Sequence, residues 1–117
     1  SAQYIRANGS ITFTSGIASR RSYPGYSAVS AMNAATEALA KAIVIELSPI
    51  RVNTVCPGFV DTEPPTSGRA QYVKTLSPTL PLSRLAVASE VADAYLYLFA
   101  NTYATGTVLV VDGGATC

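Results

Sequence analysis

The chain has 117 residues, the size of one domain, and only 13% of them are charged while 49% are hydrophobic. Eight basic and seven acidic residues leave a net charge of +1, so neither a nucleic-acid-binding surface nor an anionic-membrane footprint is expected. The charged fraction lies well below the roughly 25% of ordinary soluble chains, which predicts that a partner covers part of the outer surface.

Two further features exclude other classes of protein. Apolar runs such as 42–45 and 108–111 are too short to span a bilayer, and no charged-then-apolar leader opens the chain. We therefore expect a soluble, cytoplasmic protein with no membrane partner. The sequence has no histidine, and Cys56 and Cys117 form no Cys-x-x-Cys motif, so neither a metal site nor a disulfide framework is expected.

The first element expected along the chain is a strand over residues 10–15, SITFTS. Its residues are mostly β-branched or aromatic, and the turn signal Asn8-Gly9 precedes it. This composition predicts a buried strand.

A long helix is expected next, over residues 27–47. This run has no glycine or proline and is rich in alanine, which favours a helix. Glu37 and Lys41 have the i, i+4 spacing of a helical ion pair. Pro49 ends the helix.

The remaining elements continue the alternation of strand and helix. Strands are expected over 50–58 and 106–114, and a helix over 89–100, with a polar, proline-rich excursion over 59–82 between them. The strands are continuous apolar runs, which is typical of a parallel sheet covered on both faces. The expected fold is therefore α/β, with a doubly wound, Rossmann-like parallel sheet of about three strands and flanking helices.

Four segments carry a family resemblance: GSITFTSG, ALAKAIVIELSPIRVNTVCPGFVDT, LPLSRLAVASEVADAYLYLFA and GTVLVVDGG. In this order they resemble the C-terminal half of a short-chain dehydrogenase/reductase, over nearly the whole chain. The resemblance implies that residues 1–117 form one truncated domain without the dinucleotide-binding N-terminal half. The glycine-rich fingerprint that holds the cofactor's pyrophosphate in that family is absent from these residues.

The run YSAVS, residues 26–30, resembles the family's Tyr-x-x-x-Lys pair with its lysine missing. Family members place a serine at the end of the preceding strand, a tyrosine about thirteen residues later and the lysine one helical turn beyond. Counting from Tyr26 puts Phe13 at the serine position and Ser30 at the lysine position. Matching the helix end and the following strand instead needs no insertion, and it places Gly16, Val29 and Asn33 at the serine, tyrosine and lysine positions.

In both alignments the lysine is gone, which changes the expected chemistry. A tyrosine with an ordinary pKa of about 10 is a poor acid or base near neutrality unless a cation stabilises its phenolate. Ser30 or Asn33 can hydrogen-bond but cannot supply that charge, and Lys41 lies two helical turns beyond Asn33. Tyr26 is then either a packing residue over the strand end or a group with a new role in binding or proton transfer.

Three residues are the candidate catalytic groups: Tyr26, Ser15 and Asp61. Ser15 ends a strand at the carboxyl edge, where parallel α/β sheets bind ligands. Asp61 could serve as an acid or base if buried, as could Glu63. The family resemblance implies that Thr62 contacts the nicotinamide of a bound NAD or NADP, if an N-terminal half completes the site.

Arg20 and Arg21 form the only adjacent basic pair of the chain. They either neutralise an acidic ligand or keep an exposed loop soluble.

Three functions of different classes follow. The first is a truncated enzyme of this family that needs no cofactor and isomerises, cyclises or cleaves a small, largely apolar molecule. The second is an NAD- or NADP-dependent oxidoreductase whose other half lies on another chain. The third is a non-catalytic assembly partner of a full-length relative. In each case a homo-oligomer or another multimer is expected, because the first strand has an unpaired edge.

Overall fold

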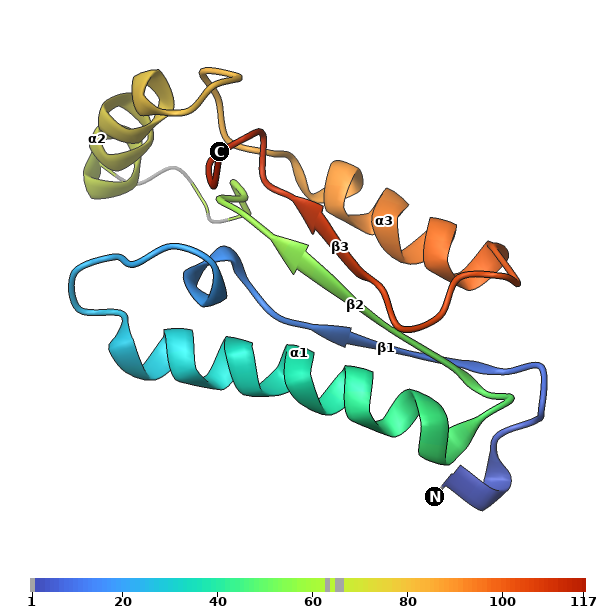
Figure 1. Ribbon diagram of the computed structural model, residues 1–117. Helices are drawn as coiled ribbons and strands as arrows, with labels where there is room; N and C mark the ends of the chain where they lie inside the picture. The colour runs from blue at the N-terminus through green and yellow to red at the C-terminus, as the bar shows by residue number, and fades with distance from the viewer. Residues whose placement is uncertain (1, 63, 65–66) are drawn as a thin grey trace.

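The computed structural model of the chain describes residues 2–62, 64 and 67–117, and a parallel three-stranded sheet forms its centre (Figure 1). The strands are β1 (Ser10–Thr14), β2 (Arg51–Pro57) and β3 (Val108–Val111), in this order across the sheet. Val55 of β2 lies between Thr14 and Leu109. The expected Rossmann-like α/β sheet of about three strands with flanking helices is confirmed.

Two long helices cover opposite faces of the sheet (Figure 1). α1 (Ser27–Leu47) has the predicted bounds, and α3 (Ala88–Ala100) begins one residue earlier than predicted. Successive residues of β2 join different hydrophobic clusters: Val55 packs with Leu98 of α3, whereas Cys56 belongs to a second cluster. This alternation is what a strand buried on both faces requires.

The polar, proline-rich excursion over 59–82 contains helices that the sequence analysis did not predict. It contains α2 (Ser67–Leu76) and a 3-10 helix, η3 (Ser77–Thr79). Val73 and Leu76 of α2 pack against the cluster that contains Cys56. Tertiary contacts of this kind stabilise a helix that local propensity alone leaves marginal. The other 3-10 helices described are η1 (Ala2–Tyr4) and η2 (Ile17–Ser19).

β1 is less buried than predicted. Four of its residues are half-buried and Thr14 is exposed, so the expectation of a buried strand is wrong. Among the described residues β1 pairs with β2 alone, which leaves a row of unpaired backbone groups along its outer edge.

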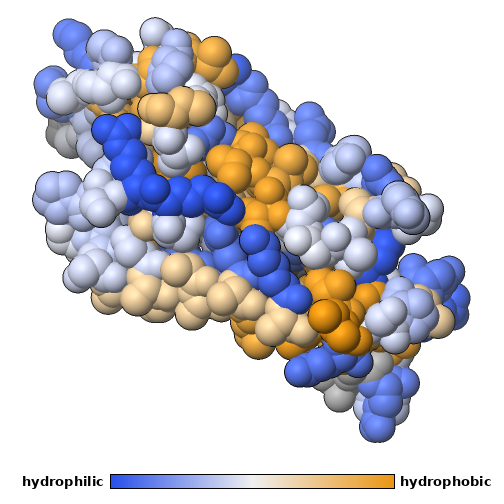
Figure 2. Space-filling model, in the orientation of Figure 1, coloured by the Kyte–Doolittle hydropathy of each residue, from blue (hydrophilic) through white to orange (hydrophobic). Residues whose placement is uncertain are grey.

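Apolar side chains remain exposed on both long helices. Met32 and Ile45 of α1 are 64% and 86% exposed, and Phe99 of α3 is 73% exposed. Figure 2 shows hydrophobic residues along the lower edge of the molecule, where α1 lies. By length and composition alone α1 could span a membrane, but here it packs on β2 and η2. The expected self-association would cover such faces and stays a prediction.

Thr54 offers a test of the core. It is fully buried in β2, and its hydroxyl has no hydrogen-bond partner among the described residues. We expect Thr54→Val to leave the free energy of unfolding unchanged or to raise it by up to about 1 kcal/mol, because valine keeps the shape and removes an unsatisfied polar group. Urea unfolding measures the change.

Thr105→Val is the matched control, since the Thr105 hydroxyl accepts a hydrogen bond from the backbone N–H of Val52 at 3.0 Å. This substitution should cost about 1 kcal/mol. A larger loss for Thr54→Val than for Thr105→Val would contradict the assignment of an unpaired hydroxyl.

Candidate active site

A cavity of about 450 Å³ opens at the carboxyl ends of β1 and β2. Parallel α/β sheets bind ligands at this edge, and the volume is in the range of small-molecule sites. The wall comes from the loop between β1 and α1, the first turns of α1, the turn after β2, and α2. Its residues are Gly16, Ile17, Ala18, Tyr23, Pro24, Tyr26, Val29, Asn33, Pro57, Gly58, Phe59, Tyr72 and Leu76.

Gly16 and Asn33 face one another in this cavity. A Cβ atom at Gly16 would lie 2.9 Å from the Asn33 Nδ2 atom, so a larger residue there would require the Asn33 side chain to move. Val29 lines the same cavity. The alignment that needs no insertion therefore puts all three of its positions into one site.

The alignment counted from Tyr26 places only one of its three positions in the cavity wall. Phe13 belongs to β1 and Ser30 to α1, and neither is among the residues that line this cavity. Tyr26 does line it, directly before the first turn of α1, and is 48% exposed. Its ring stands edge-on to that of Tyr23, with 6.2 Å between the ring centroids. The position suits both packing and contact with a ligand, so the catalytic role of Tyr26 stays a prediction.

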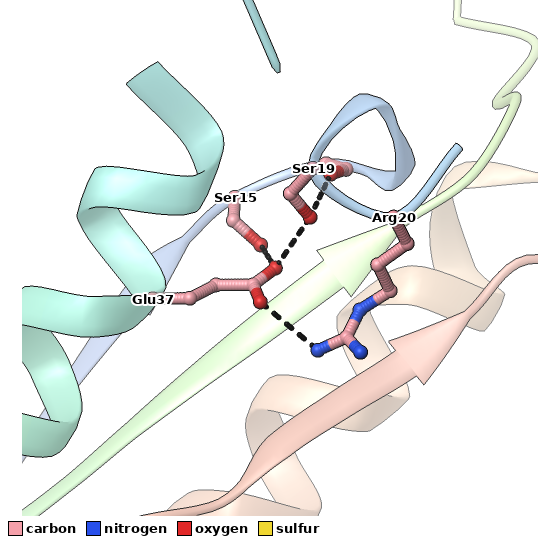
Figure 3. A network of polar contacts seen from close by, with 5 residues as sticks. Ser15, Ser19, Arg20 and Glu37 are labelled. Carbon is pink, nitrogen blue, oxygen red and sulfur yellow. Dashed lines mark hydrogen bonds and ion pairs between the residues drawn. The ribbon is translucent and has the colours of Figure 1, made fainter. Parts of the chain in front are cut away.

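Ser15 belongs to a polar network with Ser19, Arg20 and Glu37 (Figure 3). Its buried hydroxyl donates to Glu37 Oε1 at 2.7 Å. The same oxygen accepts from the Ser19 hydroxyl at 2.8 Å, and Arg20 forms an ion pair with Glu37 Oε2 at 2.9 Å. The ion pair thus joins Glu37 to Arg20, and the i, i+4 spacing to Lys41 is not what determines its partner.

The pKa of Glu37 reflects this surrounding. Burial alone would raise it, but the hydrogen bonds from Ser15 and Ser19 and the charge of Arg20 together outweigh burial, so the pKa lies below its usual value. The carboxylate is therefore ionised at neutral pH. It ties the loop between β1 and α1, including Gly16, to the middle of α1.

Glu37 is the residue that the sequence analysis missed as part of the site. A carboxylate near the middle of an alanine-rich helix is a signal that it has a partner where the helix packs on the sheet, because an isolated buried charge is costly. Ser15 was predicted as a catalytic group, and its hydroxyl is instead engaged by Glu37. A catalytic role for it stays a prediction.

Gly58 and Phe59 directly after β2 line the cavity, but the predicted site residues that follow them do not. Asp61 and Thr62 are exposed, and neither is among the lining residues. The Asp61 carboxylate accepts from Arg69 at 3.3 Å. Glu63 lies outside the described residues. The proposed acid or base role of Asp61 and the cofactor contact of Thr62 stay predictions.

Both arginines of the basic pair have protein partners. Arg20 binds Glu37, and Arg21 donates to the carbonyl oxygen of Ala115 at 2.7 Å. The Arg21 guanidinium also lies over the Tyr23 ring, 5.7 Å from its centroid. The pair therefore fixes the loop before α1.

The residues fit a nicotinamide cofactor only in part. Gly58 allows the end of β2 to approach β3, because a Cβ there would lie 2.8 Å from the Asp112 Cα, and Thr62 follows in the same exposed turn. The described residues that line the cavity include no lysine or arginine, so nothing in its wall would stabilise a tyrosine phenolate. Among the residues the structure describes, no group of three or more histidine, cysteine, aspartate or glutamate residues could hold a metal ion.

Comparison with curated proteins gives relatives of one kind. The sequence model described as enoyl-(acyl carrier protein) reductase matches residues 1–116. A short-chain dehydrogenase/reductase of Stachybotrys chlorohalonatus is 38% identical, over 91% of this chain and 43% of its own length. The peroxisomal 2,4-dienoyl-CoA reductase of Saccharomyces cerevisiae is 37% identical, over 93% of this chain and 39% of its own length. The chain thus spans about two-fifths of the length of these relatives.

Solved structures agree. A small-chain dehydrogenase in complex with NADPH superposes with a TM-score of 0.93 at 41% identity, over 98% of this chain and 54% of that one. A reductase/Diels-Alderase from Malbranchea aurantiaca superposes with a TM-score of 0.86 at 30% identity, over 95% of this chain and 44% of that one. Fold, order of elements and sequence identity together place the chain in the short-chain dehydrogenase/reductase family.

Proposed function

We propose that the cavity is the substrate site of an enzyme that has given up the family's tyrosine–lysine pair. The reaction is an isomerisation, cyclisation or elimination of a small, largely apolar molecule, without net oxidation or reduction and without a cofactor. The observation that carries the proposal is that Gly16, Asn33 and Val29 line one cavity, with the Asn33 amide 2.9 Å from where a Cβ atom of residue 16 would lie. These are the serine, lysine and tyrosine positions of one alignment.

The replacements remove the parts that a carbonyl reduction needs from the protein. Valine has no proton to give, and the neutral amide of Asn33 cannot lower the pKa of a nearby phenol as a lysine would. What the cavity retains is shape, a mostly apolar wall, the amide of Asn33 and the tyrosines Tyr23, Tyr26 and Tyr72. These can hold a substrate in a reactive conformation, which by itself accelerates unimolecular reactions.

One relative supports the idea that this fold hosts reactions without net redox change. The Malbranchea aurantiaca protein, 30% identical to this chain, is a Diels-Alderase as well as a reductase. A Diels-Alder reaction is a cyclisation that moves no hydride. For the present chain, this relative supports only the statement that a protein of this fold can catalyse a reaction without hydride transfer.

The second candidate is an NADPH- or NADH-dependent reductase. It is favoured by the relative with a TM-score of 0.93 that was solved with NADPH. In that case Thr62 would hold the nicotinamide, and an N-terminal half supplied by another chain would hold the rest of the dinucleotide. Tyr26, at the rim of the cavity, would be the remaining phenol.

Cofactor titration and product mass separate the two candidates. Calorimetric titration with NADPH and NADH is expected to give no micromolar binding. Incubation with a library of small apolar metabolites is expected to yield products of unchanged mass, or of a mass reduced by an eliminated group. Micromolar cofactor binding together with products two mass units heavier than their substrates would contradict the proposal and establish the second candidate.

Tyr26→Phe tests the phenol at the rim whose role is open. We expect turnover to fall at least about tenfold, because the hydroxyl is the part that can donate a proton, while the melting temperature stays within a few degrees because a partly exposed hydroxyl contributes little to stability. Asn33→Lys in the same assay should not create NADPH oxidation. Full turnover in Tyr26→Phe would assign Tyr26 to packing.

A further inference from the structure

We infer that the cavity binds a neutral, planar aromatic molecule of two or three fused rings, with an oxygen substituent that hydrogen-bonds to the Asn33 side chain. The inference deepens the proposed function and rests on it for the identity of the site. It is carried by the arrangement of aromatic rings in the wall and by the free amide beside Gly16.

Four aromatic side chains line the cavity: Tyr23, Tyr26, Phe59 and Tyr72. The Tyr23 ring stands edge-on to that of Phe59, with 5.8 Å between the ring centroids and an interplanar angle of 88°. It also stands edge-on to the Tyr26 ring. Aromatic pairs in such geometries attract one another beyond the effect of buried area alone. A flat aromatic ligand can extend this set of ring contacts, whereas a saturated ring of the same size cannot.

Guanidinium groups lie over two of these rings. Arg21 lies over Tyr23, and Arg69 lies over Tyr72 at 5.4 Å from the ring centroid. A cation over one ring face is attracted by the ring quadrupole and limits rotation of the side chain. Both rings line the cavity, and rings held in place favour a rigid, flat ligand.

Asn33 supplies the polar contact. Within the described part of the chain its side-chain amide has no hydrogen-bond partner, whereas Asn53 and Asn101 both use theirs within the fold. Gly16 leaves room for this amide, since any Cβ there would lie 2.9 Å from Nδ2. An amide that faces a cavity without a partner is available to a ligand oxygen, either as donor to a carbonyl or as partner of a hydroxyl.

The ligand carries no charge. Every described residue in the cavity wall is neutral, and the nearby charges of Arg20 and Glu37 neutralise one another. The guanidinium groups of Arg21 and Arg69 beside the rings already bind the Ala115 carbonyl and the Asp61 carboxylate. A carboxylate or phosphate would therefore lose hydration among neutral lining residues and would have to compete for these cations.

Three probes separate the two parts of the inference: 2-naphthol, naphthalene and decahydro-2-naphthol. We expect 2-naphthol to bind about tenfold more tightly than either of the others, measured by ligand-detected NMR or calorimetry. Naphthalene lacks only the oxygen and decahydro-2-naphthol lacks only the aromatic rings. A parallel titration with 1-tetralone tells whether a ketone serves as well as a hydroxyl.

Two variants assign each preference to its residue. Asn33→Leu should reduce the affinity for 2-naphthol to the value for naphthalene. The affinity for naphthalene should stay unchanged. Tyr72→Leu, at an exposed position of α2 that the fold can spare, should reduce the preference for 2-naphthol over its saturated analogue. Gln71→Leu is the control, because Gln71 is exposed on the same helix and bonds only to Thr75 within the described residues; it should change neither ratio.

The outcomes distinguish this inference from the proposed function. Equal affinity for 2-naphthol and its saturated analogue, or an unchanged affinity in Asn33→Leu, would overturn the aromatic ligand and leave the non-redox reaction standing. NADPH-dependent turnover would overturn the proposed reaction and leave the affinity ratios as they are.

Discussion

Replacing Arg51 with methionine is expected to lower the free energy of unfolding by about 3 kcal/mol. Arg51 is 9% exposed at the start of β2. Its Nη1 atom donates to the carbonyl oxygens of Leu98 at 2.6 Å and Asn101 at 2.9 Å, and its Nη2 atom to that of Phe99 at 3.0 Å. These are the carbonyl groups that the end of α3 leaves without helical partners.

The position also suits the charge. The C-terminus of a helix carries a partial negative charge, which a buried cation stabilises. Methionine has a similar length and would fill the space, but it would remove the Arg51 donors from the carbonyl oxygens of Leu98 and Phe99, while that of Asn101 would keep the backbone N–H of Ala104. Unpaired buried acceptors are costly. Urea unfolding with an unchanged m-value would show that the loss is one of stability and not of a change in the unfolded state.

Arg84→Met is the control for Arg51→Met. Arg84 forms two hydrogen bonds to the Glu90 carboxylate but lies on the surface, and surface ion pairs contribute little to stability. We expect almost no change in unfolding. A loss for Arg84→Met as large as that for Arg51→Met would mean that removal of any arginine, and not of the contacts to α3, explains the result.

The long elements could be predicted because the residues next to their ends determine where they begin and end. Pro24 and Gly25 precede α1 and Pro49 follows it, and no glycine or proline interrupts the alanine-rich run between them, so the bounds Ser27–Leu47 follow from propensity and are confirmed. α2 could not be found in this way. It lies between prolines, begins with Ser67 and Gly68, and depends on packing against the core for its stability.

The prediction that β1 is buried was wrong for a different reason. Its composition, β-branched and aromatic, is the same at the edge of a sheet as in its middle. Which of these applies depends on how many strands pair with it, and that is a property of the whole sheet. β2, with six successive buried residues, shows what the same kind of sequence does when it has a neighbour on each side.

The site could be predicted in position but not in detail. The carboxyl edge of the sheet follows from the alternation of strand and helix, and one alignment already named Gly16, Val29 and Asn33. The choice between the two alignments depends on the distance from Gly16 to Asn33, which local pattern does not contain. The contacts of Glu37 to Ser15 and Ser19 span 22 and 18 residues, beyond the reach of any helical spacing rule.

Glu37→Gln is expected to lower the free energy of unfolding by about 2 kcal/mol at pH 7 and to remove part of the pH dependence of stability. The glutamine keeps the shape and can accept from Ser15 and Ser19, but it has no charge for Arg20. Because the folded pKa of Glu37 lies below its usual value, protonation favours the unfolded state. Its contribution is present in full above the ordinary carboxyl pKa of about 4.3 and is lost as the pH falls through the lower folded value.

The difference between Glu37→Gln and the unaltered protein should therefore shrink as the pH falls from 5 toward 2, which urea unfolding at a series of pH values measures. The unaltered protein will still lose stability in acid, because the pKa of Glu90 is lowered to about 2 by its hydrogen bonds with Arg84. In Asp112 hydrogen bonds from Thr116 and Gly114 outweigh the effect of burial and lower the pKa. Both groups remain in the variant, so only the contribution of Glu37 differs in the comparison.

Glu46→Gln is the matched control, since Glu46 is exposed near the end of the same helix and should give no pH-dependent difference. Loss of the Arg20 contact should also loosen the loop that carries Gly16, Ile17 and Ala18 in the cavity wall. The affinity for 2-naphthol is then expected to fall in Glu37→Gln and to stay unchanged in Glu46→Gln. A stability difference that is the same at pH 7 and pH 3 would mean that the carboxylate charge is not what holds this loop, and that the hydroxyl contacts of Ser15 and Ser19 suffice.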